Sequence, residues 1–347
     1  MSEDLTRFLE TVAPETHLRV ERELGDGFVV LKRDEAERRQ AAQDVRCSED
    51  IVIELLRNSR DAGATAIYVA TTLEAGQRLI TVIDNGCGIP ERLHDTVFEP
   101  RVTSKLDSVH MDTWGIHGRG MALYSIRQNC LQARVCVSAP GLGCAMATRS
   151  DISTLPERTD QSGFPTFTLE SEGRVKIGGP KNILRTCAEF AMQHRGQVSV
   201  FVGTPTEIAA TLVDGGLQRY SLAELSLKPD EATVPFAYRP AFSHSPQQLA
   251  ELLENLGIQL STRTARRILD GEIAPLQPMH EIIRELLSAQ PLTANPTPAK
   301  RSTRKSVVKI SPEDIRNLRT QVKEDFRPLA QRYYLDGEVE PRVSVNR

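Results

Sequence analysis

The sequence lacks several features that would place it in a well-defined class. It has no run of about eighteen apolar residues, the length that a membrane-spanning helix needs. Its first residues, Met-Ser-Glu-Asp-Leu-Thr-Arg, do not have the pattern of a secretory signal peptide. Its 6 cysteines contain no C-x-x-C pair, so free thiols in a reducing compartment fit better than disulfides or a zinc site. These absences predict a cytoplasmic protein without a membrane anchor.

Two common nucleotide-binding motifs are also missing. No G-x-x-x-x-G-K-[ST] segment occurs, which excludes a P-loop, and the glycines do not follow the first strand of a βαβ unit, which disfavours a Rossmann enzyme. The net charge is only −3, so overall charge does not indicate a nucleic-acid partner. A length of 347 residues predicts about two to three domains.

Residues 48–61 have the pattern of an amphipathic helix. Ser48 is placed to cap its first turn, and the two acidic residues that follow suit the positive end of the helix dipole. Apolar and small residues recur at the spacing of one buried face, namely Val52, Leu55, Leu56 and Ser59.

A polar stripe runs along a second face of this helix. Glu54, Asn58 and Asp61 stand at i, i+4 and i+7 and therefore share one side. In a Mg-ATP site, a carboxylate can orient and deprotonate the attacking water, and an amide oxygen is a suitable ligand for Mg²⁺. The alternative is a solvated helix face without chemistry.

A predicted hairpin follows. Residues 66–72 and 79–84 are short and β-branched, and Glu-Ala-Gly-Gln between them predicts a turn. Asp84 ends the second strand and leads into Asn-Gly-Cys-Gly, where Gly86 and Gly88 allow the backbone to approach a ligand closely. A carboxylate at this strand end can accept a hydrogen bond from the amino group of adenine. An ordinary Asp-Asn-Gly turn is the alternative.

A glycine-rich segment at residues 115–120 completes the series. Its sequence is Gly-Ile-His-Gly-Arg-Gly, and it precedes an apolar stretch that predicts a helix starting at Gly118. Free backbone N–H groups at a helix start attract phosphate, and such a segment can close over a nucleotide as a lid. Lys105, in Thr103-Ser-Lys, can reach a phosphate as a point charge, although a surface lysine is the alternative.

In this order and spacing, the three motifs resemble those of the GHKL ATPases (gyrase, Hsp90, histidine kinase, MutL). The resemblance implies an α+β protein, a two-layer α/β sandwich of the Bergerat type, that binds ATP and Mg²⁺. It implies Glu54 and Lys105 as catalytic residues and Asn58 as the metal ligand. The residues that it implies for nucleotide contacts are Asn58, Asp61, Asp84, Gly86, Gly88, Thr103, Gly115, Gly118, Arg119 and Gly120.

Two branches of this superfamily fit different parts of the sequence. A histidine kinase is disfavoured, because His17 is the only histidine before the site and its neighbours do not suit a helix interior. Residues 54–65, the Asp84 motif and Thr103-Ser-Lys resemble MutL closely. The lid instead resembles the Gly-x-x-Gly-x-Gly of topoisomerase VI B, and MutL's Asn-Thr-Pro-Ala-Arg segment is absent. Residues 182–202, a predicted helix and strand, also resemble topoisomerase VI B.

A three-helix pattern lies further along the chain. The first helix begins at Ser245-Pro246 and stops at Gly257, and Ser261 or Thr262 caps a short second one that stops at Gly271. The positions that we expect to be buried are Leu249, Leu252, Leu253, Leu256, Ala265, Ile268, Leu269, Met279, Ile282, Ile283, Leu286 and Leu287. The pattern resembles the helix-two-turn-helix insert of topoisomerase VI B. Any small helical subdomain is the alternative.

Basic residues gather in two places outside the nucleotide motifs. Arg263, Arg266 and Arg267 share the short second helix, and residues 300–309 contain five cations and no acid. Such groups can neutralise DNA phosphates, or can serve only solubility.

The expected organisation is an ATP-binding domain over residues 1–215, a helical domain over 240–290, a linker over 291–305 and a helical tail over 306–347. Some sixty residues after the insert are too few for the transducer domain of topoisomerase VI B, so strand passage by this chain alone is not expected. The expected function is an ATP-gated clamp in DNA metabolism. Its expected partners are DNA, a topoisomerase VI A-like DNA-cleaving subunit and a second copy bound in the presence of ATP. The alternatives are a MutL-like mismatch repair ATPase and a nucleotide-gated scaffold or signalling ATPase without DNA.

Overall fold

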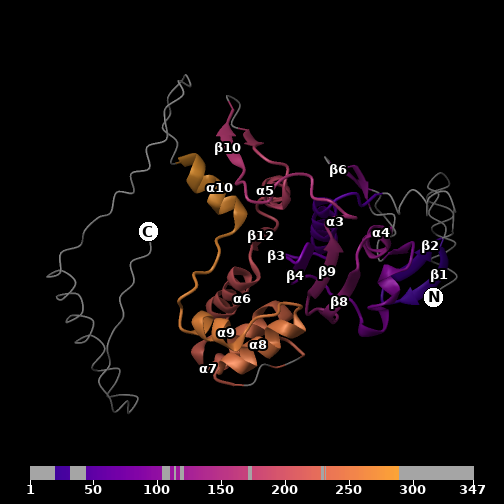
Figure 1. The fold of residues 1–347 in the computed structure, drawn as a ribbon. Helices are drawn as coiled ribbons and strands as arrows, with labels where there is room; N and C mark the ends of the chain where they lie inside the picture. The colour runs from indigo at the N-terminus through magenta and orange to yellow at the C-terminus, as the bar shows by residue number, and fades with distance from the viewer. Residues whose placement is uncertain are drawn as a thin grey trace, which may run out of the picture. The chain divides into compact units, whose positions relative to one another are not determined.

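The computed structural model describes most of the chain up to Ser288. The described residues are 20–31, 44–103, 110–112, 115–117, 121–170, 174–227, 230 and 232–288. The chain divides into two units, Met1–Pro291 and Leu292–Arg347. All described residues belong to the first unit (Figure 1). The expected linker, the expected tail and the basic stretch 300–309 lie outside them.

A five-stranded sheet forms the centre of this unit. Its order is β12-β3-β4-β9-β8, and every neighbouring pair is antiparallel except β12 with β3, which is parallel. The strands are β3 (Ala66–Glu74), β4 (Gln77–Asp84), β8 (Gln132–Ser138), β9 (Cys144–Asp151) and β12 (Ser199–Gly203). The predicted hairpin is confirmed as β3 and β4, whose turn has positive φ at Ala75 and Gly76.

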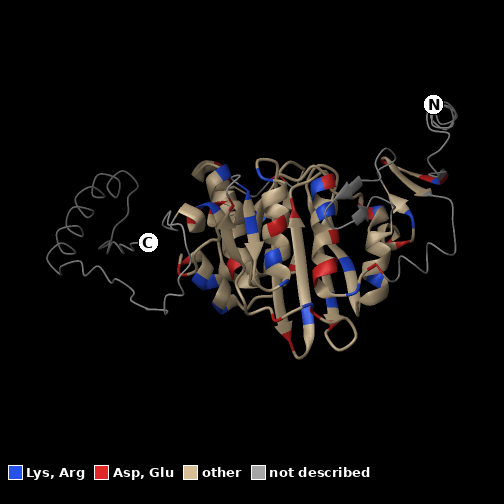
Figure 2. Ribbon diagram, turned by 90° about the horizontal axis from the view of Figure 1, so that it is seen from above, with Lys and Arg blue, Asp and Glu red and all other residues tan. Residues whose placement is uncertain are grey.

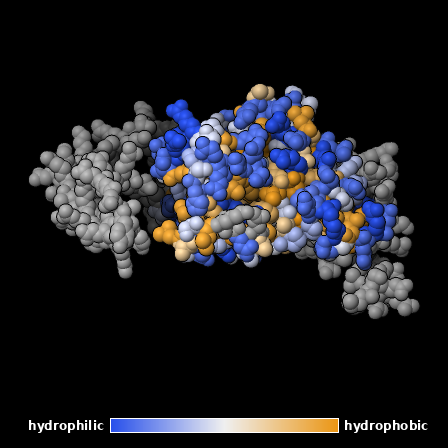
Figure 3. All heavy atoms as spheres, turned by 90° about the horizontal axis from the view of Figure 1, so that it is seen from below, coloured by the Kyte–Doolittle hydropathy of each residue, from blue (hydrophilic) through white to orange (hydrophobic). Residues whose placement is uncertain are grey.

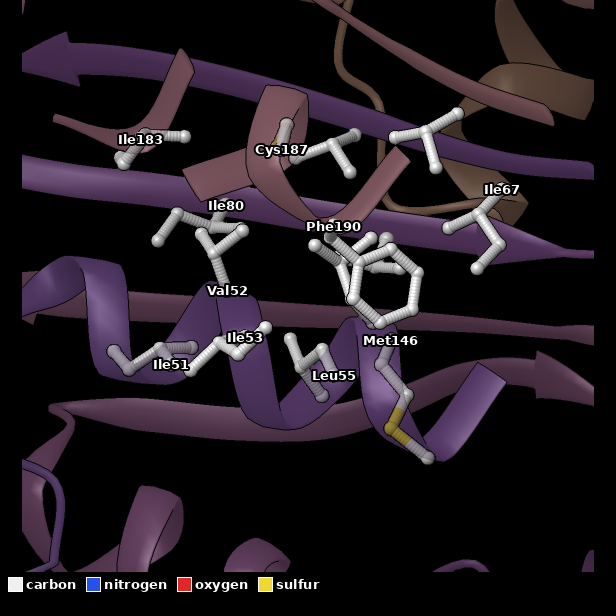
Figure 4. Close-up of a cluster of buried hydrophobic side chains, with 14 of the residues drawn as sticks. Ile51, Val52, Ile53, Leu55, Ile67, Ile80, Met146, Ile183, Cys187 and Phe190 are labelled. Carbon is white, nitrogen blue, oxygen red and sulfur yellow. The ribbon is translucent and has the colours of Figure 1, made fainter. Parts of the chain in front are cut away.

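One face of this sheet, here called the site face, packs against four helices. They are α3 (Ser48–Asp61), α4 (Ala122–Asn129), α5 (Ile183–Gln193) and α10 (Met279–Ser288). Strand residues that point to this side are large and aliphatic, and they include Ile67, Val69, Ile80 and Val82. Figure 4 shows α3 and α5 side chains, such as Leu55 and Phe190, meeting strand residues in this core.

The opposite face, here called the back face, is also covered. Its helices are α6 (Pro205–Arg219), α8 (Pro246–Asn255), α9 (Thr262–Leu269) and the 3₁₀ helix η3 (Phe236–Phe242). Alternate strand residues point this way because side chains alternate along a strand, and several of them are small: Ala66, Ala70 and Ala145. The small residues let the covering segment approach the sheet closely, and the Thr81 hydroxyl donates to the carbonyl of Gly257 at 3.1 Å.

Smaller elements border the central sheet. A three-stranded sheet has the order β1-β2-β5, and two further hairpins pair β6 with β7 and β10 with β11. Their bounds are β1 (Val20–Gly25), β2 (Phe28–Leu31), β5 (Val102–Thr103), β6 (His110–Asp112), β7 (Gly115–His117), β10 (Thr166–Leu169) and β11 (Val175–Gly178). Three short helical turns complete the described elements: η1 (Glu91–Leu93), η2 (Thr96–Phe98) and α7 (Leu222–Leu225). None of the described helices is both long and apolar enough to cross a membrane.

The α+β sandwich of sheet and helices is confirmed, and so are the ends of α8 and α9. Ser261, not Thr262, caps α9 by accepting from the Thr264 backbone at 3.2 Å. Burial of Leu269 and Leu286 was wrongly predicted, because these side chains, near the ends of their helices, are 36% and 41% exposed.

The three predicted helices do not all cover the same layer. Helices α8 and α9 share the back-face core with α6, whereas Met279 and Ile283 of α10 enter the site-face core beside α5. The helical region expected over 240–290 therefore contributes to both faces of the central sheet. Figure 3 shows the surface from below, where hydrophobic residues lie among hydrophilic ones.

Candidate nucleotide-binding site

Helix α3 carries the polar stripe that the sequence predicts. Leu55 and Leu56 are fully buried in the site-face core, whereas Glu54, Asn58 and Asp61 are each partly exposed. The stripe therefore lies along one side of an otherwise buried helix. Three polar groups at such a boundary can reach a ligand while the helix stays fixed by its core.

The start of α3 differs from the prediction. Cys47, not Ser48, is the N-cap residue, and it makes no side-chain cap hydrogen bond. Ser48 already lies in the first turn, and its buried hydroxyl has no hydrogen-bond partner among the described residues. Asp50 anchors this end instead, because it accepts from the Arg46 backbone at 2.9 Å and pairs with Arg158.

Glu54 is bonded within its own helix. Its Oε1 accepts from Nη1 of Arg57, one turn further along, and the two form an ion pair. The Glu54 side chain is 20% exposed and that of Arg57 only 3%. The candidate general base thus lies at the surface edge of the helix while its cationic partner is buried.

Asn58 has a polar atom without a partner. Its side-chain nitrogen Nδ2 is buried and makes no hydrogen bond to any described residue. A buried amide that is not satisfied within the protein costs free energy of about 1–3 kcal/mol. Turning the amide by half a rotation places its oxygen at the same point, because the two ends have the same shape. Asn58 is therefore suited to bind something that the protein itself does not supply.

Asp61 is already held by the neighbouring Arg60 at the end of α3. Its Oδ1 accepts from Nε of Arg60 at 2.8 Å and lies 2.6 Å from Nη2 of the same residue. Arg60 also places Nη1 3.3 Å from Nε2 of His194, at the end of α5. Arg60 therefore links Asp61 to the end of α5. A role in nucleotide binding remains a prediction for this residue.

Asp84 lies at the end of β4, directly beside α3. Its carboxylate is 6% exposed, Oδ2 accepts from the Ser59 hydroxyl at 2.8 Å, and Oδ1 accepts from the Gly86 backbone at 2.8 Å. Burial raises the pKa of Asp84 above its ordinary value, and the hydrogen bonds from Gly86, Ser59 and the Cys144 backbone oppose this rise. An ionised carboxylate has about four lone-pair sites, so with three hydrogen bonds the group can still accept one from a base amino group.

The glycines after Asp84 are required by close contacts. A Cβ on Gly86 would lie 2.8 Å from the Ala62 carbonyl oxygen, and a Cβ on Gly88 would lie 2.0 Å from that of Ala139. Gly88 also has a φ of +71°, which other residues rarely adopt. These close contacts are with other segments of the chain, and a close approach of this backbone to a ligand remains a prediction.

Two residues of this region were not predicted from the sequence. Ser59 was expected only as part of the buried face, yet it binds the Asp84 carboxylate. Gly143 lies against the other side, where an added Cβ would lie 2.1 Å from the Asp84 carbonyl oxygen. The Gly-Leu-Gly segment at 141–143, between two strands, was the available signal for Gly143. The position of Ser59 directly after Asn58 was the signal for the serine.

The remaining candidate residues are described only in part. Thr103 is 7% exposed and ends β5, which pairs with β2 of the small sheet. Gly115 begins β7, opposite Asp112 of β6. Lys105, Gly118, Arg119 and Gly120 lie outside the described residues, as does the predicted start of a helix at Gly118. The described helix α4 begins at Ala122.

Comparison with known families agrees with this geometry. The profile of the family described as "Histidine kinase-, DNA gyrase B-, and HSP90-like ATPase" matches residues 44–159, which include α3, the Asp84 turn and β9. The chain carries a GHKL ATPase domain.

The named relatives of this ATPase domain are MutL proteins. The DNA mismatch repair protein MutL of Aquifex pyrophilus is 39% identical over 104 residues, which cover 28% of this chain and 24% of the relative. MutL of Heliobacterium modesticaldum is 42% identical over 90 residues, covering 25% of this chain and 13% of the relative. The chain thus spans a quarter or less of the length of these relatives. They favour the MutL-like alternative over topoisomerase VI B.

A solved structure matches this ATPase more loosely. It is the crystal structure of full-length ShkA in complex with AMPPNP, at 13% identity and a TM-score of 0.23, over 79% of this chain and 63% of the other. A superposition of this quality adds nothing to the sequence matches.

Asn85, the residue after Asp84, links the Asp84 turn to the helix η3 on the back face of the sheet. The Asn85 oxygen accepts from the Thr65 and Ala66 backbones, both at 2.9 Å, and its nitrogen donates to the Tyr238 hydroxyl of η3 at 3.2 Å. The pKa of Tyr68 on β3 is raised, mainly by burial and to a smaller extent by the nearby Tyr238 hydroxyl. The turn that holds Asp84 is therefore fixed by contacts on both faces of the sheet.

The arginine cluster lies on the back-face side of the central sheet. Arg263, Arg266 and Arg267 are all exposed on α9, and Arg267 donates to Glu272 at 3.1 Å. Figure 2 shows basic and acidic residues interspersed over the described elements. The predicted cluster of exposed cations is present on one helix, and its binding to DNA remains a prediction.

Proposed function

We propose that this chain binds Mg-ATP, hydrolyses it, and uses the cycle as a conformational switch in a DNA transaction. The observation that carries the proposal is the 2.8 Å hydrogen bond from Ser59 to Asp84. It joins the helix of the polar stripe to the strand end that holds the base-reading carboxylate. The candidate groups for binding adenine, binding the metal ion and activating water thus come from two elements, α3 and β4, that share one hydrophobic core.

Each group has a distinct task in this proposal. Asp84 accepts a hydrogen bond from the adenine amino group, and Glu54 accepts a proton from the attacking water. The water oxygen bonds to the γ-phosphorus while the bond from that phosphorus to the β,γ-bridging oxygen breaks, so ADP and phosphate are released. Lys105 and the segment 115–120 are proposed to contact the phosphates, with Arg119 among them.

The residues present fit Mg²⁺ as the accompanying ion. No three His, Cys, Asp or Glu side chains gather at a possible metal site within the described ranges, so a protein-only cage is not evident there. Mg²⁺ often binds through one or two protein oxygens together with substrate phosphates, and it supplies charge neutralisation to those phosphates. The buried, unsatisfied amide of Asn58 suits this minimal donor set.

A binding experiment tests the nucleotide site. Calorimetry should give ATP binding that strengthens with Mg²⁺, and phosphate release should accompany it. In the Asn58→Ala variant, ATP should bind about tenfold or more weakly with Mg²⁺ present, because a hydrogen bond or ligand to a charged group contributes about 1.5–3 kcal/mol. The same variant in EDTA should bind ATP as the parent does. A parent chain that binds no ATP would reject the proposed function.

Two branches of the superfamily are candidates, and each is supported by a different observation. The MutL relatives support an ATPase in DNA mismatch repair, and proteins of this kind suggest an ATP-dependent homodimer. The capped helices α8 and α9 with their exposed arginines support the second candidate, a topoisomerase VI B-like protein with a DNA-cleaving partner.

DNA stimulation separates these candidates from a scaffold that does not bind DNA. Both DNA-linked candidates predict that duplex DNA raises the rate of phosphate release, and that ATP or a non-hydrolysable analogue increases the dimer fraction in sedimentation. Mixing with a topoisomerase VI A-type protein distinguishes the two, since only the second candidate predicts a stable complex. Absence of DNA binding at low salt, with and without ATP, would leave the scaffold ATPase.

A further inference from the structure

The charged partner of Glu54 is an unusual feature of the polar stripe. Arg57 is three residues beyond Glu54 on α3 and, at 3% side-chain exposure, is almost completely buried. A buried guanidinium is costly unless it is paired and hydrogen-bonded. Arg57 donates to Oε1 of Glu54, so this carboxylate is one of the groups that compensate its burial.

The other carboxylates near the stripe have different partners. Asp61 is held by Arg60, and Asp84 accepts from Ser59 and from the Gly86 backbone. Among these three carboxylates, the described contacts thus pair Glu54 with Arg57, the most deeply buried of the arginines on α3. The candidate base is therefore fixed by a group that does not itself lie at the exposed edge of the helix.

We propose that Arg57 is a positioning residue for hydrolysis: it fixes the direction of the Glu54 carboxylate and keeps it ionised. The proposal rests on the proposed ATPase function. A buried cation in contact with a carboxylate favours the charged form, and only the charged form can take a proton from water. The rigid, planar guanidinium also restricts the rotation of its partner more than an ammonium group does.

A second ion pair in the molecule provides a matched control. Arg78 on β4 pairs with Glu157, with side-chain exposures of 7% and 17%, close to those of Arg57 and Glu54. Arg78 lies six residues before Asp84 on the same strand, about 20 Å away at the rise of a β-strand. Removing either arginine takes one ion pair from a carboxylate of similar exposure, but only one of these carboxylates is the candidate base.

The experiment compares Arg57→Gln, Arg57→Lys and Arg78→Gln in the full chain. Turnover at saturating Mg-ATP is measured as a function of pH, together with ATP affinity and thermal unfolding. In Arg57→Gln the acid limb of the profile should move to higher pH by about one unit or more, because loss of a nearby cation raises a carboxyl pKa by about 1–3 units. Arg57→Lys should restore the limb but keep a lowered kcat. Arg78→Gln should leave the limb in place.

Each outcome decides a different point. If Arg57→Gln binds ATP and keeps the parental acid limb, Arg57 has no positioning role. If Arg57→Gln does not fold, the lysine variant decides, and a parental kcat in that variant overturns the proposal. If the parent binds ATP without turnover, Glu54 is not a base and the role of Arg57 falls with it. If the parent binds no ATP, the proposed function itself fails.

Discussion

The two faces of the central sheet are built from different residues and serve different purposes. The site face packs Ile67, Val69, Ile80 and Val82 against α3 and α5, and α3 carries Glu54, the one catalytic candidate among the described residues. The back face presents the small residues Ala66, Ala70 and Ala145 beside larger ones such as Tyr68, and Gly257 approaches it closely. Large side chains hold helix α3, with its polar stripe, at a fixed distance from the sheet, whereas small ones allow the covering segments to pack closely.

This difference predicts that substitutions on the two faces change different measurements. Changes to the polar stripe should alter turnover and affinity with little effect on stability, and changes at Asp84 should alter affinity. Changes at the back-face contacts should alter stability with little effect on the affinity of the folded protein. The predictions below test this separation, from the largest expected effect to the smallest.

The largest effect is expected from Glu54→Ala on the site face. Turnover should fall by about 10²–10⁴-fold, the contribution of a general base, while ATP still binds. Phosphate release under saturating ATP gives the rate and calorimetry gives the affinity. Glu251→Ala, which removes an exposed carboxylate from α8 on the back face, is the control and should retain parental turnover. Parental turnover in Glu54→Ala would exclude this residue as the base.

The second effect belongs to the back face. Gly257 has a φ of +82°, and an added Cβ would lie 2.6 Å from Sγ of Cys136 and 3.2 Å from Cβ of Ala147. Gly257→Ala should lower the free energy of unfolding by about 2–4 kcal/mol, through both the left-handed backbone and overpacking. Gly271→Ala is the matched control, since its φ is +70° but no atom lies within 4 Å of the added Cβ.

Urea unfolding of the two glycine variants measures this difference. Gly271→Ala should cost only the backbone contribution of about 1–2 kcal/mol. Equal losses in the two variants would show that the close fit of Gly257 against the sheet contributes nothing. ATP affinity of the folded fraction should stay parental in both.

The third effect concerns base recognition at Asp84. Asp84→Asn should weaken ATP binding at least about tenfold, because a hydrogen bond to a charged acceptor contributes about 1.5–3 kcal/mol. Asp270→Asn, at the exposed end of α9, provides the control. Calorimetry that gives the parental dissociation constant for Asp84→Asn would remove this residue from the site.

The raised pKa of Asp84 adds a dependence on pH. The folded carboxyl has a pKa above that of the unfolded chain, so its burial is destabilising above the folded pKa, and this cost disappears as pH falls to about 3.9. Relative to Asp84→Asn, the parent should therefore gain stability as pH falls through this window. ATP affinity of the parent should fall over the upper part of the same window, as the carboxylate takes up its proton. Parallel curves for parent and variant would contradict this.

The smallest effect is expected from the arginine cluster. Replacing Arg263, Arg266 and Arg267 with Ala should reduce the salt dependence of DNA binding, whose log–log slope is about −0.9 per neutralised phosphate on duplex DNA. Basal ATPase activity should stay intact. The control removes three exposed cations from the site-face side, Lys181, Arg195 and Arg284. Equal slopes for the two triple variants in anisotropy titrations would assign the effect to net charge alone.

The sequence predicted the elements whose signals are local. The hairpin of β3 and β4, the stop of α8 at Gly257 and the polar stripe of α3 all follow from spacing and turn residues over a few positions. The prediction that Ser48 caps α3 was wrong. Asp50 instead anchors this helix start through Arg158, which comes from a distant segment. The predicted burial of Leu269 was wrong, because periodicity does not determine how far along a short helix the packing against neighbouring elements continues.

Long-range contacts account for what the sequence did not predict. Nothing local indicates that Ser59 reaches Asp84, that Asn85 reaches Tyr238, or that α10 joins a different core from α8. The partner of Glu54 is local, since Arg57 stands at i+3, but an arginine in a helix is usually exposed, so its burial could not be predicted from spacing. Sequence motifs thus located the candidate site, and tertiary packing determined how each group is held.

The parallel pairing of β12 with β3 has a consequence for the order in which this molecule can be completed. During synthesis β3 leaves the ribosome early, but Ser199–Gly203, its neighbour on one side, follows only after α5. Until then one border of the nascent sheet offers unpaired backbone groups to any other chain. A fragment cut at the limits of the family match, residues 44–159, would leave the groups of β3 that pair with β12 without their partners. A shortened chain that keeps β3 paired on both sides must therefore extend through β12.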